Sequence, residues 1–194
     1  MQQKRARLDS EPARFLDSGP PPVIFAPGTE VKRAEAFSAS SIRAVAQLGR
    51  RAILLSRHTQ QLPSQLPEGI IAFPHIPFST ALPRAAAIVH HGGIGTVAHA
   101  FATGIPQIIR PMAHDQPDNA ARVGRLGVGK TIHPQEYTAR RLQSALQALL
   151  SSDSVSETSR RYSERVASDK ALSIICDEIE GLANIKARSR TRHV

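Results

Sequence analysis

The feature that most constrains the fold is a series of short apolar runs, each ending at small or polar residues and followed by a helical pattern. The clearest case is IVHHGGIGTVAHA, residues 88–100, where three glycines fall within four residues directly after an apolar run. Glycines between a strand and a helix let a ligand approach the backbone and leave the first N–H groups of the helix free. Because these groups and the helix dipole favour an anion, the segment predicts a phosphate site.

Apolar runs of this kind alternate with helical patterns along most of the chain. We expect strands over residues 23–26, 51–56, 69–73, 86–91, 106–111 and 128–132. We expect helices over residues 12–16, 34–48, 96–102, 117–126, 138–150, 154–167 and 170–183, with Ser154 and Glu157 as a capping box. Such alternation builds βαβ units, and strands without polar alternation are covered on both faces. The sequence therefore predicts an α/β fold: a doubly wound, Rossmann-like parallel sheet with a helical C-terminal segment.

The chain of 194 residues is long enough for a single domain with a substantial core. We expect a polar linker over residues 1–18, the folded domain over 19–184 and a disordered basic tail over 185–194. The tail contributes four of the nine excess positive charges, and a solvated tail is favoured over a nucleic-acid-binding arm. Cys176 stands alone, which excludes an intrachain disulfide, and its apolar surroundings predict a small buried side chain.

The ends and hydropathy of the chain bear on its location. No apolar run approaches the roughly 18 residues that a membrane span needs. The first residues are basic but lack the apolar stretch of a secretory signal. With a lone cysteine as well, we expect a cytoplasmic protein that neither spans a membrane nor binds nucleic acid.

Two neighbouring histidines end the fourth predicted strand. Adjacent residues of a strand point to opposite faces, so His90 and His91 are poor partners for one metal ion. We expect one of them to face the site and the other to pack into the core. In a parallel sheet of this type, ligands bind beyond the carboxyl ends of the strands, where the strand order reverses. Residues 28–29, 91–93 and 112–116 all follow predicted strands.

Three interpretations of the glycine-rich turn compete. It can cradle the phosphates of a nucleotide-linked sugar. It also matches a dinucleotide fingerprint, because Gly93, Gly95 and Ala98 fit G-x-G-x-x-A and Asp115 lies about twenty residues further on. In the third interpretation the glycines serve only close packing of the helix on the sheet. This interpretation does not explain why His91, Asp115 and Gln116 stand at the ends of predicted strands. A serine hydrolase is disfavoured, since no G-x-S-x-G occurs in the chain.

The complete motif is more specific than its glycines. The chain resembles the donor-binding half of GT-B glycosyltransferases. The resemblance lies in the order of its motifs: H-H-G-G-x-G-T, a helix, G-x-P, an apolar strand, a proline and D-Q-x-x-N-A. The similarity is to bacterial antibiotic and macrolide glycosyltransferases, rhamnosyltransferases and sterol glucosyltransferases, and more distantly to plant and animal UDP-glycosyltransferases. It runs from about Phe15 to about Leu182 and includes PPVIFAPGT and HIPFSTALPRAAAIVHHGG.

The resemblance implies roles for particular residues. The donor diphosphate would be held by His91, Gly93, Gly95, Thr96, Gly28 and Thr29. Sugar hydroxyls would be bound by Asp115 and Gln116, with Asn119 supporting that loop. The nucleobase and ribose would be lined by His75, Ile76, Phe78 and His99. At three of these last positions the sequence departs from many plant relatives, which carry Trp, Gln and Glu where His75, Phe78 and His99 stand.

The resemblance also implies an activity. A hexose would pass from a UDP- or TDP-sugar to a hydroxyl of a small-molecule or lipid acceptor, with inversion and without a metal or other cofactor. The N-terminal domain of the family, which binds the acceptor and carries the catalytic base, has no counterpart here, so we expect no catalytic residue in this chain. The alternatives are a non-catalytic nucleotide-sugar-binding subunit, a truncated inactive fragment and, less favoured, a dinucleotide-binding oxidoreductase domain.

Overall fold

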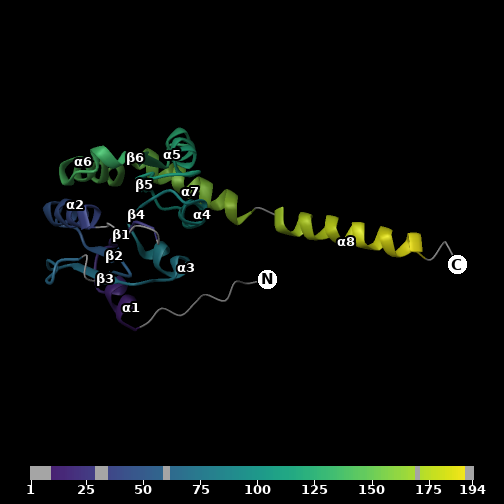
Figure 1. Cartoon of the computed structure of the whole chain (residues 1–194), viewed down its shortest axis with the longest axis horizontal. Coiled ribbons are helices and arrows are strands. Elements are labelled where there is room, and N and C mark those ends of the chain that lie inside the picture. The colour runs from purple at the N-terminus through teal and green to yellow at the C-terminus, as the bar shows by residue number, and fades with distance from the viewer. Residues whose placement is uncertain (1–9, 29–34, 59–61, 169–170, 191–194) are drawn as a thin grey trace.

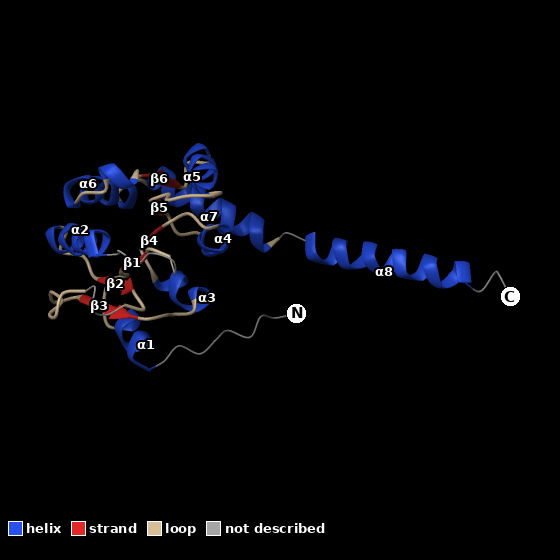
Figure 2. Ribbon diagram, viewed as in Figure 1, coloured by secondary structure: helices blue, strands red, loops and turns tan. Residues whose placement is uncertain are grey.

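The structure is a computed structural model that describes residues 10–28, 35–58, 62–168 and 171–190. These residues form a six-stranded sheet of β1 (Val23–Ala26), β2 (Ala52–Leu55), β3 (Ile70–Phe73), β4 (Ala87–His90), β5 (Gln107–Ile109) and β6 (Gly129–Thr131). Neighbouring strands are all parallel, in the order β3-β2-β1-β4-β5-β6 (Figure 2). The order reverses between β1 and β4, whose Ala26 and His90 are partners in register. The predicted doubly wound sheet is confirmed.

Helices cover both faces of the sheet, as the apolar strands predict. They are α1 (Ser10–Asp17), α2 (Glu35–Gln47), α3 (Phe78–Ala81), α4 (Ile94–Thr103), α5 (Gln116–Arg125), α6 (Ala139–Leu150), α7 (Asp153–Ala167) and α8 (Ala171–Arg190), with short 3-10 turns η2 (Leu82–Arg84) and η3 (Pro134–Glu136). The side chains of β1 alternate between two cores. Val23 and Phe25 pack with α2 and α6, whereas Ile24 packs with α1, η2 and α4. Of these elements, α3, η2 and η3 lie in stretches for which no element was predicted.

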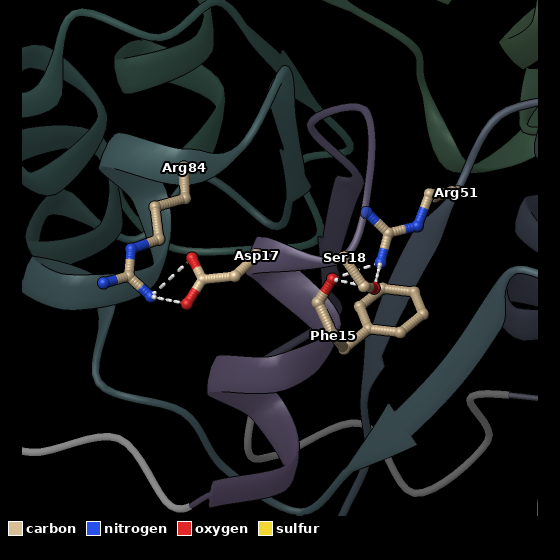
Figure 3. A network of polar contacts seen from close by, with 5 residues as sticks. All are labelled: Phe15, Asp17, Ser18, Arg51 and Arg84. Carbon is tan, nitrogen blue, oxygen red and sulfur yellow. Dashed lines mark hydrogen bonds and ion pairs between the residues drawn. The ribbon is translucent and has the colours of Figure 1, made fainter.

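Helix α1 is bound to the body of the domain, so the predicted linker over residues 1–18 does not describe it. Its Leu16 is buried, and Arg51 lies over the ring of Phe15, 4.1 Å from the ring centroid. Figure 3 shows Arg51 donating to the carbonyl of Phe15 and, at 2.9 Å, to Ser18, with Arg84 in an ion pair with Asp17. Residues 1–9 lie outside the described part of the chain.

Helix α7 begins earlier than its sequence pattern predicts. The N-cap is Ser152, whose hydroxyl accepts the N–H of Val155, so the proposed capping box at Ser154 and Glu157 is wrong. The competing serine lies two residues upstream, and its position three residues before Val155 suits the same side-chain cap.

Helix α8 extends away from the sheet, as Figure 1 shows. It continues to Arg190, so residues 185–190 are helical where a disordered tail was predicted; residues 191–194 lie outside the described part. Cys176 is exposed, which corrects the prediction of a buried side chain, because α8 does not lie against the core at this point. The neighbouring Ile174, Ile175 and Ile179 are exposed as well.

Candidate functional site

A cavity of about 440 Å³ lies at the carboxyl ends of the first four strands. Its lining follows β1, β2, β3 and β4 in turn: Ala26, Pro27 and Gly28; Leu55, Ser56, Arg57 and His58; Pro74 to Ser79; and His91, Thr96 and His99. It thus opens beside the point between β1 and β4 where the strand order reverses. This is the position at which doubly wound sheets bind their ligands.

The imidazole of His91 lies between two glycines. A Cβ atom on Gly28 would come within 3.0 Å of His91 Nδ1, and one on Gly93 within 2.6 Å of Nε2. Gly28 also has a φ of +102°, which few residues other than glycine adopt. Nδ1 is buried and has no hydrogen-bond partner among the described residues. The ring therefore occupies space that is free only because both residues lack a side chain.

Helix α4 presents its N-terminus beside this ring. Its N-cap is Gly93, which has no side chain to cap the helix, so the amides of Ile94 and Gly95 remain for a ligand. The helix begins two residues before the predicted start, which puts Thr96 in the first turn rather than at the cap. Gly93 and Gly95 are outside the cavity lining, whereas Thr96 is part of it. Thr29 lies outside the described residues.

Replacing Gly93 with alanine should displace the His91 ring. The added Cβ would lie 2.6 Å from Nε2, so the ring has to shift to make room for it. Overpacking of this kind costs about 1–3 kcal/mol of folding stability, and we expect the displaced ring to weaken the binding of uridine diphosphate in titration calorimetry as well. Gly124→Ala is the matched control, because a Cβ there meets nothing within 4 Å. Equal affinities for the two variants would contradict this placement of His91.

The predicted nucleobase wall is brought together at the cavity. His75, Ile76, Phe78 and His99 all line it, and the rings of Phe78 and His99 meet edge to face with centroids 5.8 Å apart. Ile76 is also part of the core beneath, which anchors the loop after β3. The wall therefore offers apolar and aromatic surface for a planar ring.

Two basic residues of the cavity were missed by the sequence analysis. Arg57 and His58 follow β2 and line the same cavity as His91 and Thr96. The serine before them forms a local turn, in which Ser56 Oγ accepts the N–H of His58 at 3.1 Å. The rule that ligands bind beyond strand ends applies to β2 as it does to β1 and β4, and would have identified them. No acidic residue lines the cavity within the described part of the chain, so its charge suits an anion.

Asp115 and Gln116 lie outside the cavity lining, at the start of α5. Gln116 Oε1 accepts the N–H groups of Met112 and Ala113 at 2.8 and 3.2 Å, which leaves the amide nitrogen of Gln116 as the group offered outward. Asp115 Oδ2 accepts from Asn119 Nδ2 at 2.8 Å. The backbone between these contacts is unusual, because His114 has a φ of +59°.

Asn119 connects this loop to the glycine-rich turn. Its Nδ2 donates to the carbonyl of Gly92 at 2.9 Å as well as to Asp115. A Cβ on Gly92 would lie 3.4 Å from the Cβ of Gln116, so the two loops are in direct contact. The predicted sugar and diphosphate residues are thus placed on adjoining loops.

The two adjacent histidines face different ways, as predicted. His91 lines the cavity, whereas His90 is fully buried and pairs through Nε2 with Gln107 Oε1 at 2.9 Å. Burial lowers the pKa of His90 to about 4, and the neighbouring His91 adds to that shift while the Gln107 bond opposes it. His90 is therefore neutral at physiological pH.

The described residues contain no group of three or more His, Cys, Asp or Glu side chains arranged to hold a metal ion. They also contain no helix with the length and hydropathy to cross a membrane.

Comparison with known proteins places the chain in a family. Residues 40–182 match the family described as "Erythromycin biosynthesis protein CIII-like, C-terminal domain". This chain belongs to that family. The match spans most of the sheet and its helices, and the C-terminal half of a GT-B fold, expected from the sequence motifs, is confirmed.

Individual relatives are glycosyltransferases. The chain is 31% identical over 180 residues to O-mycaminosyltylonolide 6-deoxyallosyltransferase of Streptomyces fradiae, covering 91% of this chain and 42% of that protein. It is 41% identical over 125 residues to vancomycin aglycone glucosyltransferase of Amycolatopsis orientalis, covering 63% and 30%. The crystal structure of glycosyltransferase VinC in complex with DTDP superposes with a TM-score of 0.70 at 26% identity, covering 84% and 41%. The chain therefore spans less than half the length of these proteins.

Proposed function

We propose that this chain is the donor-binding domain of a glycosyltransferase that uses a UDP- or TDP-sugar. The observation that carries the proposal is the cavity at the strand-order reversal, which is lined by the polar His91 and Thr96 and by the apolar Ile76 and Phe78, with Arg57 as a cation. A nucleoside diphosphate has a planar base, whose faces can stack on apolar and aromatic side chains, and an anionic diphosphate, so it matches both kinds of lining residue. Bound DTDP in the VinC structure supports a nucleotide of this class.

The proposed reaction is an inverting displacement. The oxygen of an acceptor hydroxyl forms a bond to the anomeric carbon while the bond from that carbon to the diphosphate oxygen breaks. The hydroxyl proton passes to a base that we assign to the part of a full-length relative that this chain does not span. The electron pair leaves on the diphosphate, whose charge His91 and the N-terminus of α4 would stabilise without a metal ion.

The sugar would extend from the diphosphate turn toward α5. Asp115 can accept hydrogen bonds through Oδ1, and the Gln116 amide nitrogen can donate, so the pair suits neighbouring sugar hydroxyls. The acceptor, a small molecule or a lipid, would approach from outside this chain. A non-catalytic nucleotide-sugar-binding subunit would use the same site and differ only in lacking turnover.

Asp115→Asn should separate sugar binding from nucleotide binding. The variant keeps an oxygen for Asn119 but loses the charge and half of the acceptor capacity. We expect a loss of about 1–3 kcal/mol in the binding of UDP-glucose and little change for UDP alone. Calorimetric titrations of both ligands make the comparison, with Asp118→Asn as a control because Asp118 is exposed and paired to Arg122.

The same pair of titrations discriminates between the competing interpretations. A dinucleotide fingerprint puts Asp115 on a ribose, so that interpretation requires parallel losses for both ligands. Parallel losses would overturn the assignment of Asp115 to the sugar, and an unchanged affinity for UDP-glucose would do so as well.

A further inference from the structure

The peptide groups on either side of Gly92 are held by buried side chains. β4 ends at His90 and α4 begins at Ile94, so residues 91–93 alone form the turn between them. The N–H of Gly92 donates to His90 Nδ1 at 3.1 Å, and its carbonyl accepts from Asn119 Nδ2 at 2.9 Å. These two bonds hold Gly92. It lies between His91, whose ring lines the candidate diphosphate site, and Gly93, which is the N-cap of α4.

The hydrogen bonds determine the tautomer of His90. A backbone N–H can only donate, so Nδ1 must carry the lone pair and Nε2 must carry the proton. Nε2 then donates to Gln107 Oε1 at 2.9 Å. The reverse tautomer would leave two hydrogens facing each other at Gly92. His90 is neutral, fully buried and bonded at both nitrogens, so its orientation is fixed.

Packing on both sides of the turn limits how it can respond if this bond is lost. Gly92 has a φ of +95°, and a Cβ there would lie 2.7 Å from Ile109 Cγ2. The turn is therefore packed against β5 on one side and held by Asn119 on the other. Loss of the acceptor at His90 leaves the buried N–H of Gly92 without a hydrogen-bond partner. Rotation of the peptide between His91 and Gly92 would bring this N–H back into contact with water.

We propose that His90 is a positioning residue for the donor diphosphate. Its Nδ1 holds the Gly92 peptide, and that peptide sets both the direction of the His91 ring and the first N–H groups of α4. The inference rests on the proposed function and goes beyond it, because His90 itself never touches the ligand. Geometry alone, with His90 facing away from the cavity, predicts an effect on stability and none on affinity.

Two substitutions divide the roles of the two His90 nitrogens. The amide of asparagine reaches the position of Nδ1 and can accept from Gly92, whereas the amide of glutamine reaches the position of Nε2 and can bond Gln107. Both variants remove the imidazole from the same buried site. We expect His90→Asn to bind UDP within about threefold of the wild type and His90→Gln to bind about tenfold more weakly, as one unmet buried donor implies.

Protein stability serves as the control for this pair. If His90 acts only as a core residue, both variants should lower the melting temperature and leave the affinity for UDP unchanged. A lower affinity in His90→Gln than in His90→Asn at similar melting temperatures supports the inference. Equal affinities for the two variants overturn it and leave the proposed function intact, whereas failure of the wild-type chain to bind UDP or TDP overturns both.

The tautomer gives a second readout that needs neither ligand nor variant. A long-range ¹H–¹⁵N spectrum of the wild-type chain at neutral pH should show His90 protonated at Nε2 and unprotonated at Nδ1. Slow exchange of the Gly92 amide proton is expected from the same bond. Protonation at Nδ1 would overturn the inference even if the variants fail to fold.

Discussion

Replacing His91 with alanine is expected to weaken the binding of UDP and TDP about 10- to 150-fold. A hydrogen bond to a charged group is worth about 1.5–3 kcal/mol, and alanine leaves the diphosphate without that donor. The ring projects into the cavity between Gly28 and Gly93, and Nδ1 has no partner among the described residues, so few bonds within the domain are lost with it. Titration calorimetry measures the affinities.

His133→Ala is the matched control for this experiment. His133 is exposed and lies outside the cavity lining, so its removal should leave the affinity unchanged. Melting temperatures of both variants should stay close to that of the wild type. An affinity of His91→Ala equal to that of the control would contradict the placement of the diphosphate beside His91.

Acidification should destabilise the domain through His90. The pKa of His90 is lowered to about 4 by burial, against about 6.5 in the unfolded chain, so the unfolded state binds the proton more tightly. The neutral His90 therefore stabilises the folded state fully above pH 6.5, the pKa of the unfolded chain, and this stabilisation is lost as the pH falls toward the pKa of the folded state. The free energy of unfolding should decrease by about 3 kcal/mol between pH 7 and pH 4 through His90 alone. Urea denaturation at the two pH values measures it.

Carboxylates also titrate in this range, so a variant is needed to isolate His90. His90→Asn carries no titratable group at the same buried position. Its free energy of unfolding should fall less between the two pH values, by about the 3 kcal/mol assigned to His90. The same decrease in the wild type and in His90→Asn would show that His90 is not held neutral by burial.

Most of the sheet could be predicted from the sequence because its central strands are runs of apolar residues. AILL over 52–55 and AIVH over 87–90 have no polar alternation, and each is followed by polar or glycine-rich residues. These local signals place the strand ends and, with the rule for doubly wound sheets, the edge at which the cavity opens. His91 could be assigned to that edge from its position after β4.

Features that depend on distant contacts could not be predicted. The pairing of His90 with Gln107 joins β4 to β5, and no local pattern specifies which core histidine finds which amide. The packing of α1 depends on Arg51 of the segment before β2. The exposure of Cys176 follows from the direction of α8, which its apolar pattern does not encode.

Part of the site could be predicted because its residues follow the ends of predicted strands. His75 and Phe78 line the cavity together with the predicted His91, although they are far apart in the sequence, because all follow strands of one sheet. Arg57 was not predicted, because the residues directly after β2 contain no glycine and no recognisable motif. The direct bond from Asn119 to Gly92 also requires the folded chain, because α5 and the turn meet only in three dimensions.

Calorimetric titration of the chain with UDP and with TDP, each with and without a chelator, tests the central claim most directly. A site built from a helix N-terminus, His91 and Thr96 should hold a diphosphate without a metal ion. We predict binding of at least one of the two nucleotides, unchanged by EDTA and tighter than the binding of NAD. Loss of binding in EDTA, or tighter binding of NAD than of either nucleotide, would contradict the account.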